Sequence, residues 1–148
     1  ADCTLPADAE RLIADGLAAS GKRWGRFDVS LAGAHPLLKI IAFMMNWRSR
    51  LTGIATGDQG LFVTRGLFAA AGGFPAIALM EDIALSRILK THGAPLCLHE
   101  RITASGRRWE RHGVLRTIVL MWRLRLAYFF GAKPADLAAR YDSARCHD

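Results

Sequence analysis

Segments with helical and strand-like patterns alternate along this chain of 148 residues, and the alternation predicts an α/β fold. Apolar residues recur at helical spacing in residues 6–19 and 36–49, and polar and apolar side chains alternate between them, in residues 26–31. The length suffices for one core, and neither a linker nor an internal repeat divides the chain. We therefore expect a single domain, residues 1–148, in which helices flank a short mixed sheet and long helices end the chain.

The first half of the chain predicts a strand between two helices. Helix 6–19 ends ahead of Gly21, because a glycine just past the last turn commonly stops a helix. Residues 26–31 alternate as a strand does when only one of its faces is buried. Pro36 opens the second helix, which runs to about Ser49. Its apolar density indicates a helix that is buried or that partly faces a membrane, and we expect burial.

Two further strands and four further helices are predicted in the second half. Gly72 and Gly73 supply the positive backbone angles that stop one helix, and Gly93 closes the next. In order, these elements are a strand at 59–64, helices at 65–71 and 81–93, a strand at 95–103, and helices at 110–130 and 134–141.

The charge balance favours anionic partners. The formal net charge is +7, and arginines gather between Arg101 and Arg125, which suits phosphorylated ligands, nucleic acid or an acidic membrane face. The cysteines, Cys3, Cys97 and Cys146, are odd in number and widely spaced, so a disulfide framework is not expected. With no signal-peptide pattern visible, the sequence predicts a cytoplasmic protein, with peripheral contact at the inner membrane face as a further option.

Residues 114–130 come closest to a membrane-spanning pattern, but Arg116, Arg123 and Arg125 interrupt them. Arg123 and Arg125 lie on opposite sides of a helix, so the segment is not cleanly amphipathic. A core helix with salt-bridged arginines is the interpretation that we favour, and docking on a membrane surface is the alternative.

Glu81 and Asp82 stand where a helix begins. Carboxylates are common in a first helical turn because they complement the helix dipole, so a capping role is the simplest interpretation. Their context favours chemistry instead, since the Gly72–Gly73 turn and residues 74–80 could form a lip over a pocket. A carboxylate in such a place, Asp82 above all, can act as a general base toward an alcohol. Asp58 stands at a strand start, where a turn role is the default.

A second cluster, Arg107-Arg108-Trp109 with His112, combines arginines with an aromatic ring. This composition suits recognition of a diphosphate with a sugar or base stacked beside it. Nucleic acid is not expected, because the pattern extends neither along a helix nor across a sheet. A salt-bridged helix start, in which Trp109 fills the core, is equally compatible with the sequence.

Several of these residues together are similar to a known family. The segments are Gly57–Arg65 with Phe68, Gly72–Pro75, Leu79–Ile83, Leu85–Arg87, Gly93 and Ser105–Gly113. They resemble the acceptor half of a family 2 glycosyltransferase, and the last segment narrows the resemblance to the subgroup of radical-SAM/selenodomain-associated glycosyltransferases. The opening residues Ala1–Pro6 resemble the end of that subgroup's His-Ala-Asp-Thr segment, its version of the Asp-x-Asp metal motif.

The resemblance implies a GT-A fold and inverting transfer of a sugar from a nucleotide-sugar donor to an acceptor hydroxyl. Asp82 would be the base that deprotonates this hydroxyl, and Asp2 would hold a divalent metal, Mg²⁺ or Mn²⁺, at the leaving diphosphate. Ser105 stands where processive relatives carry the glutamine of a Gln-x-x-Arg-Trp motif, so processive polymer synthesis is not expected. The residues expected at the substrates are Asp58, Glu81, Arg107, Arg108, Trp109 and His112.

The nucleotide-binding strands that precede the metal motif in this family are not in the sequence. We therefore expect the C-terminal, acceptor-side part of a transferase, which alone is not competent and binds nucleotide sugars weakly, with the metal held only at a complete donor site. A missing half-sheet would expose an edge and invite self-association. The alternative is a non-catalytic basic module that binds an anionic membrane surface or a partner protein.

Overall fold

The computed structural model describes residues 3–106 and 113–146, and it confirms a mixed α/β fold built on a small mixed sheet. The elements, in chain order, are β1 (Cys3–Thr4), α1 (Ala9–Ser20), β2 (Trp24–Ala32), α2 (Leu37–Thr52), the 3₁₀ turn η1 (Gly57–Gln59), β3 (Phe62–Val63), α3 (Arg65–Ala70), α4 (Glu81–Thr91), β4 (Leu96–Ser105), α6 (Val114–Phe129) and α7 (Pro134–Cys146).

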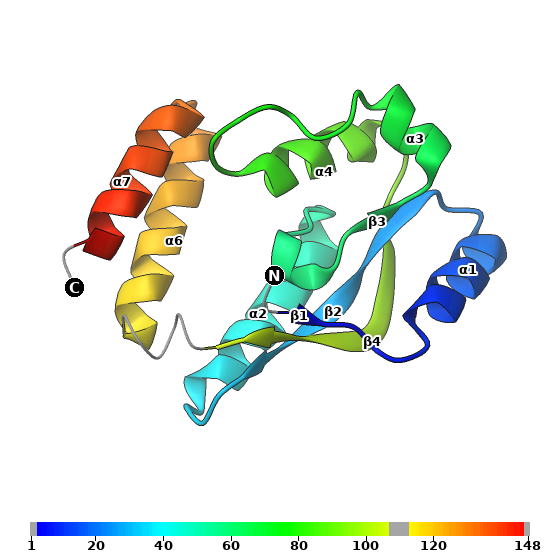
Figure 1. Cartoon of the computed structure of the whole chain (residues 1–148), viewed down its shortest axis with the longest axis horizontal. Coiled ribbons are helices and arrows are strands. Elements are labelled where there is room, and N and C mark those ends of the chain that lie inside the picture. Colours follow the sequence, from blue (N-terminus) through cyan, green and yellow to red (C-terminus); the bar gives the residue numbers. More distant parts are fainter. Residues whose placement is uncertain (1–2, 107–112, 147–148) are drawn as a thin grey trace.

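The described sheet has the strand order β1-β4-β2-β3. Its two long strands, β2 and β4, run parallel with Val29 opposite Ile102, whereas β1 and β3 pair antiparallel at the two outer positions. Figure 1 shows α1 at one end of the molecule and the α6–α7 pair at the other, with the sheet and α2 between them. The sheet and α2 therefore separate α1 from the α6–α7 pair (Figure 1).

Most elements lie where the sequence predicts them, and the helix stops follow the glycines. Gly21 has the left-handed backbone of a helix C-cap (φ 65°), and Gly72 and Gly73 follow α3 with φ of 78° and 76°. The strand expected at 59–64 is divided instead into η1 and the short β3. Helix α7 extends five residues beyond its expected end at 141, and the first residues of helix 110–130 lie outside the described part.

Strand β2 corrects one expectation, because it is buried on both faces rather than on one. Every residue from Trp24 to Val29 is buried. The polar members of the alternation, Arg26 and Asp28, face the interior and find partners there, since β4 lies beside β2 and α2 packs against it. An alternating pattern can thus mark a strand with one apolar and one ion-paired face.

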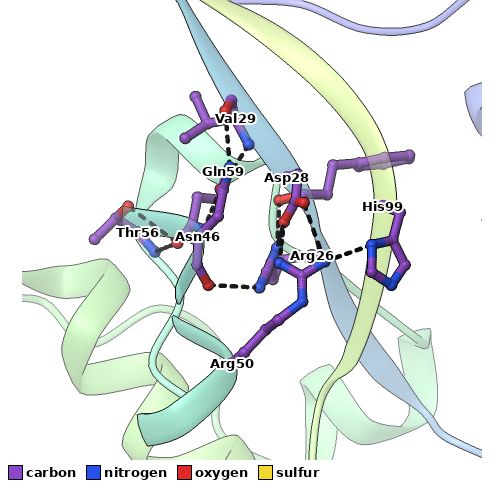
Figure 2. Close-up of polar contacts among 9 residues, drawn as sticks. Arg26, Asp28, Val29, Asn46, Arg50, Thr56, Gln59 and His99 are labelled. Carbon is purple, nitrogen blue, oxygen red and sulfur yellow. Dashed lines mark hydrogen bonds and ion pairs between the residues drawn. The ribbon is translucent and has the colours of Figure 1, made fainter. Parts of the chain in front are cut away.

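A buried ion cluster fixes α2 on β2 (Figure 2). Arg26, which is fully buried, pairs with Asp28 and donates a second hydrogen bond to the backbone oxygen of Asn46, 3.2 Å away. Arg50 on α2 donates to both carboxylate oxygens of Asp28, at 2.6 and 3.0 Å, and its guanidinium also contacts Nδ1 of His99 on β4 at 3.0 Å. The cluster therefore joins β2 to α2 through the Asp28 carboxylate, and α2 to β4 through Arg50 and His99.

The amide of Asn46 takes the place of a neighbouring strand. Its Oδ1 accepts from the backbone N–H of Val29 (2.9 Å) and its Nδ2 donates to the Val29 oxygen (3.0 Å), as a paired residue would (Figure 2). Strand β3 pairs only with Trp24 and Gly25, so Val29 lies beyond its reach. Because unpaired buried backbone groups are costly, this side chain stabilises the middle of β2.

Helix α2 corrects a second expectation, that it is buried. One face packs inward with Leu38, Ile41 and Met45, but the opposite face exposes large apolar side chains to solvent. These are Ile40, Phe43, Met44, Trp47 and Leu51. The apolar residues of α2 cover both faces of the helix, and only one of these faces packs against the interior.

We predict that Asp28→Asn lowers the free energy of unfolding by about 3 kcal/mol, because two guanidiniums lose their buried counter-ion. The matched control is Asp8→Asn, which removes the partner of Arg11 in an exposed ion pair and should change stability little. Urea titration of both variants measures the difference. Equal effects would contradict the structural role of Asp28.

The same cluster sets a pH dependence. Burial by itself raises the pKa of Asp28, but the hydrogen bonds from Arg50 and Arg26 outweigh it and hold this pKa below its ordinary value of 3.8. The stabilisation is therefore complete above the ordinary pKa and is lost as the pH falls through the lowered one. In Asp28→Asn, the acid branch of the stability profile should be flatter than in the native chain.

Candidate functional site

Asp82, in the first turn of α4, is held by two backbone amides. Its Oδ1 accepts a hydrogen bond from the backbone N–H of Ile83, and its Oδ2 accepts one from the N–H of Gly57, each at 2.7 Å. The side chain is partly buried, and each carboxylate oxygen keeps a second lone pair for another donor. The cap interpretation is therefore correct in part, but one of the two amides belongs to a different segment of the chain.

Gly57 reaches Asp82 because the end of α2 is tied to α4. Gly53 ends α2 in the left-handed conformation (φ 66°) and turns the chain toward α4. There the hydroxyl of Ser86 accepts from the N–H of Ala55 and donates to its oxygen, both at 3.1 Å. Lys90 donates to the backbone oxygen of Thr52 at 2.5 Å. The backbone of Gly57 is thereby placed against the start of α4.

A buried glutamine connects this turn to the network on β2. Gln59, fully buried in η1, accepts from the backbone N–H of Thr56 through Oε1 (3.2 Å) and donates from Nε2 to Oδ1 of Asn46 (3.3 Å). Asn46 in turn pairs with Val29 (Figure 2). A continuous series of hydrogen bonds therefore runs from the sheet to the residue next to Gly57.

Met80 sets the other side of the α4 start. It is the non-glycine residue with positive φ (70°) in the described chain, a conformation that costs about 1 kcal/mol. Its buried side chain packs with Ile83 and with Leu124 and Leu137 of the two last helices. Packing against α6 and α7 thus maintains a strained backbone two residues before Asp82.

A groove of about 1350 Å³ lies between α2 and α6, with Gly57 and Asp58 in its wall. Its lining is mostly apolar, and many of these side chains are also exposed to solvent. The apolar side chains from α2 and α6 are Ile40, Ile41, Met44, Met45, Trp47, Leu51, Ile118, Val119, Met121, Trp122, Leu126 and Phe129. Because Gly57 donates to Asp82, the carboxylate lies at the margin of this groove.

Three arginines line the groove, Arg48 from α2 and Arg123 and Arg125 from α6. Arg123 is exposed, whereas Arg48 and Arg125 are partly buried. Burial lowers the pKa of Arg48 to about 10, with a further contribution from the charge of Arg125, against the attraction of Asp82. Burial also lowers the pKa of Arg125, and the charges of Asp82 and Asp58 oppose this. The two guanidiniums and the two carboxylates therefore share one electrostatic environment.

Neither Arg48 nor Arg125 is paired within the part of the chain that the structure describes. Nε and Nη2 of Arg48 and Nε of Arg125 are buried without a hydrogen-bond partner among the described residues. Within this part of the chain, no carboxylate oxygen comes within 4 Å of either guanidinium. The expectation of salt-bridged arginines in residues 114–130 is therefore wrong for Arg125. Buried hydrogen-bond donors without partners lower the stability of a fold, and a common reason for their presence is that they bind a ligand.

The structure brings some of the predicted site residues together and leaves others apart. Asp58 lines the groove within the turn η1, as its default interpretation expected, and Asp82 is joined to the groove wall by its hydrogen bond from Gly57. Glu81 is exposed at the first position of α4. The loop expected to form a lip, residues 72–80, contributes nothing to the lining of this groove, and Met80 is buried in the core instead. Asp2, Arg107, Arg108, Trp109 and His112 lie outside the described residues.

The metal expected from the resemblance has no ligand set in the described chain. Asp2, its expected ligand, lies outside that part, and no group of three or more His, Cys, Asp or Glu residues gathers within it. We therefore assign no step to a metal. Likewise, no helix in residues 3–106 and 113–146 is long and apolar enough to cross a bilayer.

Comparisons of the chain with protein-family models, curated proteins and solved structures found no match. The function is therefore inferred from the geometry around Asp82 and from the resemblance of the segments that surround it.

We predict that Arg125→Met leaves the free energy of unfolding unchanged or raises it by about 1 kcal/mol, because a buried charge without a direct partner disappears. Arg50→Met is the control and should lower stability by about 2 kcal/mol, because Arg50 holds Asp28. Thermal and urea unfolding give both values. A loss in Arg125→Met as large as in the control would show that Arg125 serves the fold.

Proposed function

We propose that this chain carries the acceptor side of an inverting family 2 glycosyltransferase, with Asp82 as the general base. One observation supports this above all: the Asp82 carboxylate is oriented by two backbone amides from different segments and lies at the margin of an apolar groove. A capping carboxylate needs neither the second amide nor the groove. A base needs both a fixed position and access to substrate.

The proposed reaction is a single displacement. A lone pair of the Asp82 carboxylate takes the proton from the acceptor hydroxyl, and the hydroxyl oxygen forms a bond to the anomeric carbon of the sugar. The bond from that carbon to the nucleoside diphosphate breaks at the same time, and its electron pair leaves with the diphosphate. Attack opposite the leaving group inverts the anomeric configuration.

The remaining site residues keep the roles that the resemblance implies. Asp58 would contact the acceptor, and its position in the groove wall beside Gly57 supports this role. Glu81 stands next to the base, exposed at the helix start. The donor side is assigned to Arg107, Arg108, Trp109 and His112, with a divalent metal at Asp2. The donor would be a nucleotide sugar, and the nucleotide-binding part of the GT-A fold would hold its nucleotide.

We predict that Asp82→Asn lowers sugar transfer at least about 100-fold in the natural gene product that contains this sequence, because the amide cannot accept the proton. The matched control is Asp136→Asn, which makes the same change in the first turn of α7. Transfer is measured as nucleoside diphosphate released from a panel of UDP- and GDP-sugars with hydroxylated acceptors. Unaltered circular dichroism shows that the variant folds.

Persistent transfer by Asp82→Asn would exclude Asp82 as the base. If no donor in the panel is turned over by the native protein, while anionic vesicles retain it in a salt-sensitive manner, the non-catalytic basic module is the better description. That alternative has one observation in its favour, the exposed apolar side chains of α2 and α6.

The position of Asp82 can be tested through its partner. Gly57→Pro removes the donating N–H at the first position of η1, where proline is tolerated and the extended Thr56 before it suits proline. We predict a kcat about tenfold lower, because the carboxylate loses one of its two anchors. Gly57→Ala is the control, since its Cβ would lie 3.9 Å from Asp82 and the N–H remains. Equal kcat in both variants would contradict the positioning role.

A further inference from the structure

The walls of the α2–α6 groove suit a long apolar chain. The apolar lining residues of α2 run from Ile40 to Leu51 and those of α6 from Ile118 to Phe129, which is about 16 Å along each helix axis. At about 1350 Å³ the groove is larger than the roughly 300–1,000 Å³ that enclose a drug-sized ligand. Along this length, apolar side chains on both walls are exposed to solvent. An extended alkyl chain would cover them.

The arginines of the groove suit an anion. Arg48 and Arg125 contribute two positive charges whose buried nitrogens have no hydrogen-bond partner in the described chain. The charge of Asp82 acts on both guanidiniums, and the residue that donates to Asp82, Gly57, lies in the groove wall. An anion there would offset the repulsion between the two arginines and would be held close to the base.

We propose that the groove binds the acceptor, an anionic lipid with one alkyl chain, a phosphate group and a free hydroxyl. The alkyl chain lies between α2 and α6, the phosphate contacts Arg48 and Arg125, and the hydroxyl is presented to Asp82. This assignment rests on the proposed function and names its acceptor class.

The position of the charges favours a single lipid molecule over two other occupants. The surface of a bilayer would meet exposed cations such as Arg116, whereas Arg48 and Arg125 are recessed and partly buried. A second copy of this chain, with its net charge of +7, would bring further positive charge toward the two arginines. An anionic group on a chain thin enough to enter the groove satisfies both the walls and the guanidiniums.

Binding of alkyl phosphates tests the proposal without any transfer reaction. Octyl, decyl and dodecyl phosphate are titrated into the chain below their micelle concentrations, with calorimetry and the fluorescence of Trp47 and Trp122 as readouts. We expect one site per chain and an affinity that rises about fourfold for each added methylene. Dodecyl maltoside, which is uncharged, should bind at least about tenfold more weakly than dodecyl phosphate.

Variants identify the anion site. Arg125→Gln and Arg48→Gln, on different helices, should each weaken dodecyl phosphate binding about tenfold or more. Arg116→Gln makes the same change at an exposed position of α6 outside the groove lining and should leave the affinity within about twofold. Two independent variants keep the test decisive if one of them does not fold.

Several results would overturn the proposal. They are absence of binding at millimolar dodecyl phosphate, equal binding of dodecyl maltoside, and an equal loss in Arg116→Gln. If retention on anionic vesicles depends on Arg116 but not on Arg125, the groove binds a bilayer surface. If the chain forms a dimer that alkyl phosphate does not dissociate, the groove binds a second copy of the chain. UDP binding that requires both arginines, without alkyl phosphate binding, would assign them to the donor.

The two proposals fail separately. If the chain binds alkyl phosphates but transfer survives Asp82→Asn, the lipid site is supported and Asp82 is excluded as the base. If transfer depends on Asp82 but the chain does not bind alkyl phosphates, Asp82 is supported as the base and the lipid acceptor is excluded.

Discussion

The buried carboxylate of Asp28 is the interaction on which the rest of the arrangement depends. It lies in the central strand and neutralises Arg26 from the same strand and Arg50 from α2. With Asn46 bonded to the backbone of Val29, it determines both where α2 lies and how the helix is rotated. A helix held on one face by ion pairs and amides must present its other face outward, and that face forms one wall of the groove.

The same rotation places the polar residues of the site. Asn46 holds Gln59, which holds the turn that carries Gly57, and Gly57 orients Asp82. Two features of the site are unfavourable for stability, the left-handed Met80 and the unpaired nitrogens of Arg48. Strain and unsatisfied buried donors of this kind concentrate at functional sites, where a substrate compensates for them. Their coincidence around one carboxylate supports the assignment of Asp82.

Local rules predicted much of the fold, because periodicity and glycine stops depend on neighbouring residues. They located α1, α3 and α4 within a few residues, and they identified Asp82 at a helix start. They could not show that Arg26 and Asp28 face inward, since the polarity of a strand face does not reveal a partner such as Arg50, 22 residues away from Asp28. Arg48 and Arg125 were missed as a pair for the same reason. An arginine on an otherwise apolar helical face was the only local signal for each.

A crystal structure of the chain with dodecyl phosphate would test the central claim most directly, that the groove beside Asp82 is an acceptor site. We predict that the phosphate lies between Arg48 and Arg125, that the alkyl chain follows α2 and α6, and that Gly57 still donates to Asp82. A phosphate bound elsewhere, or an Asp82 carboxylate turned away from the groove, would contradict the account.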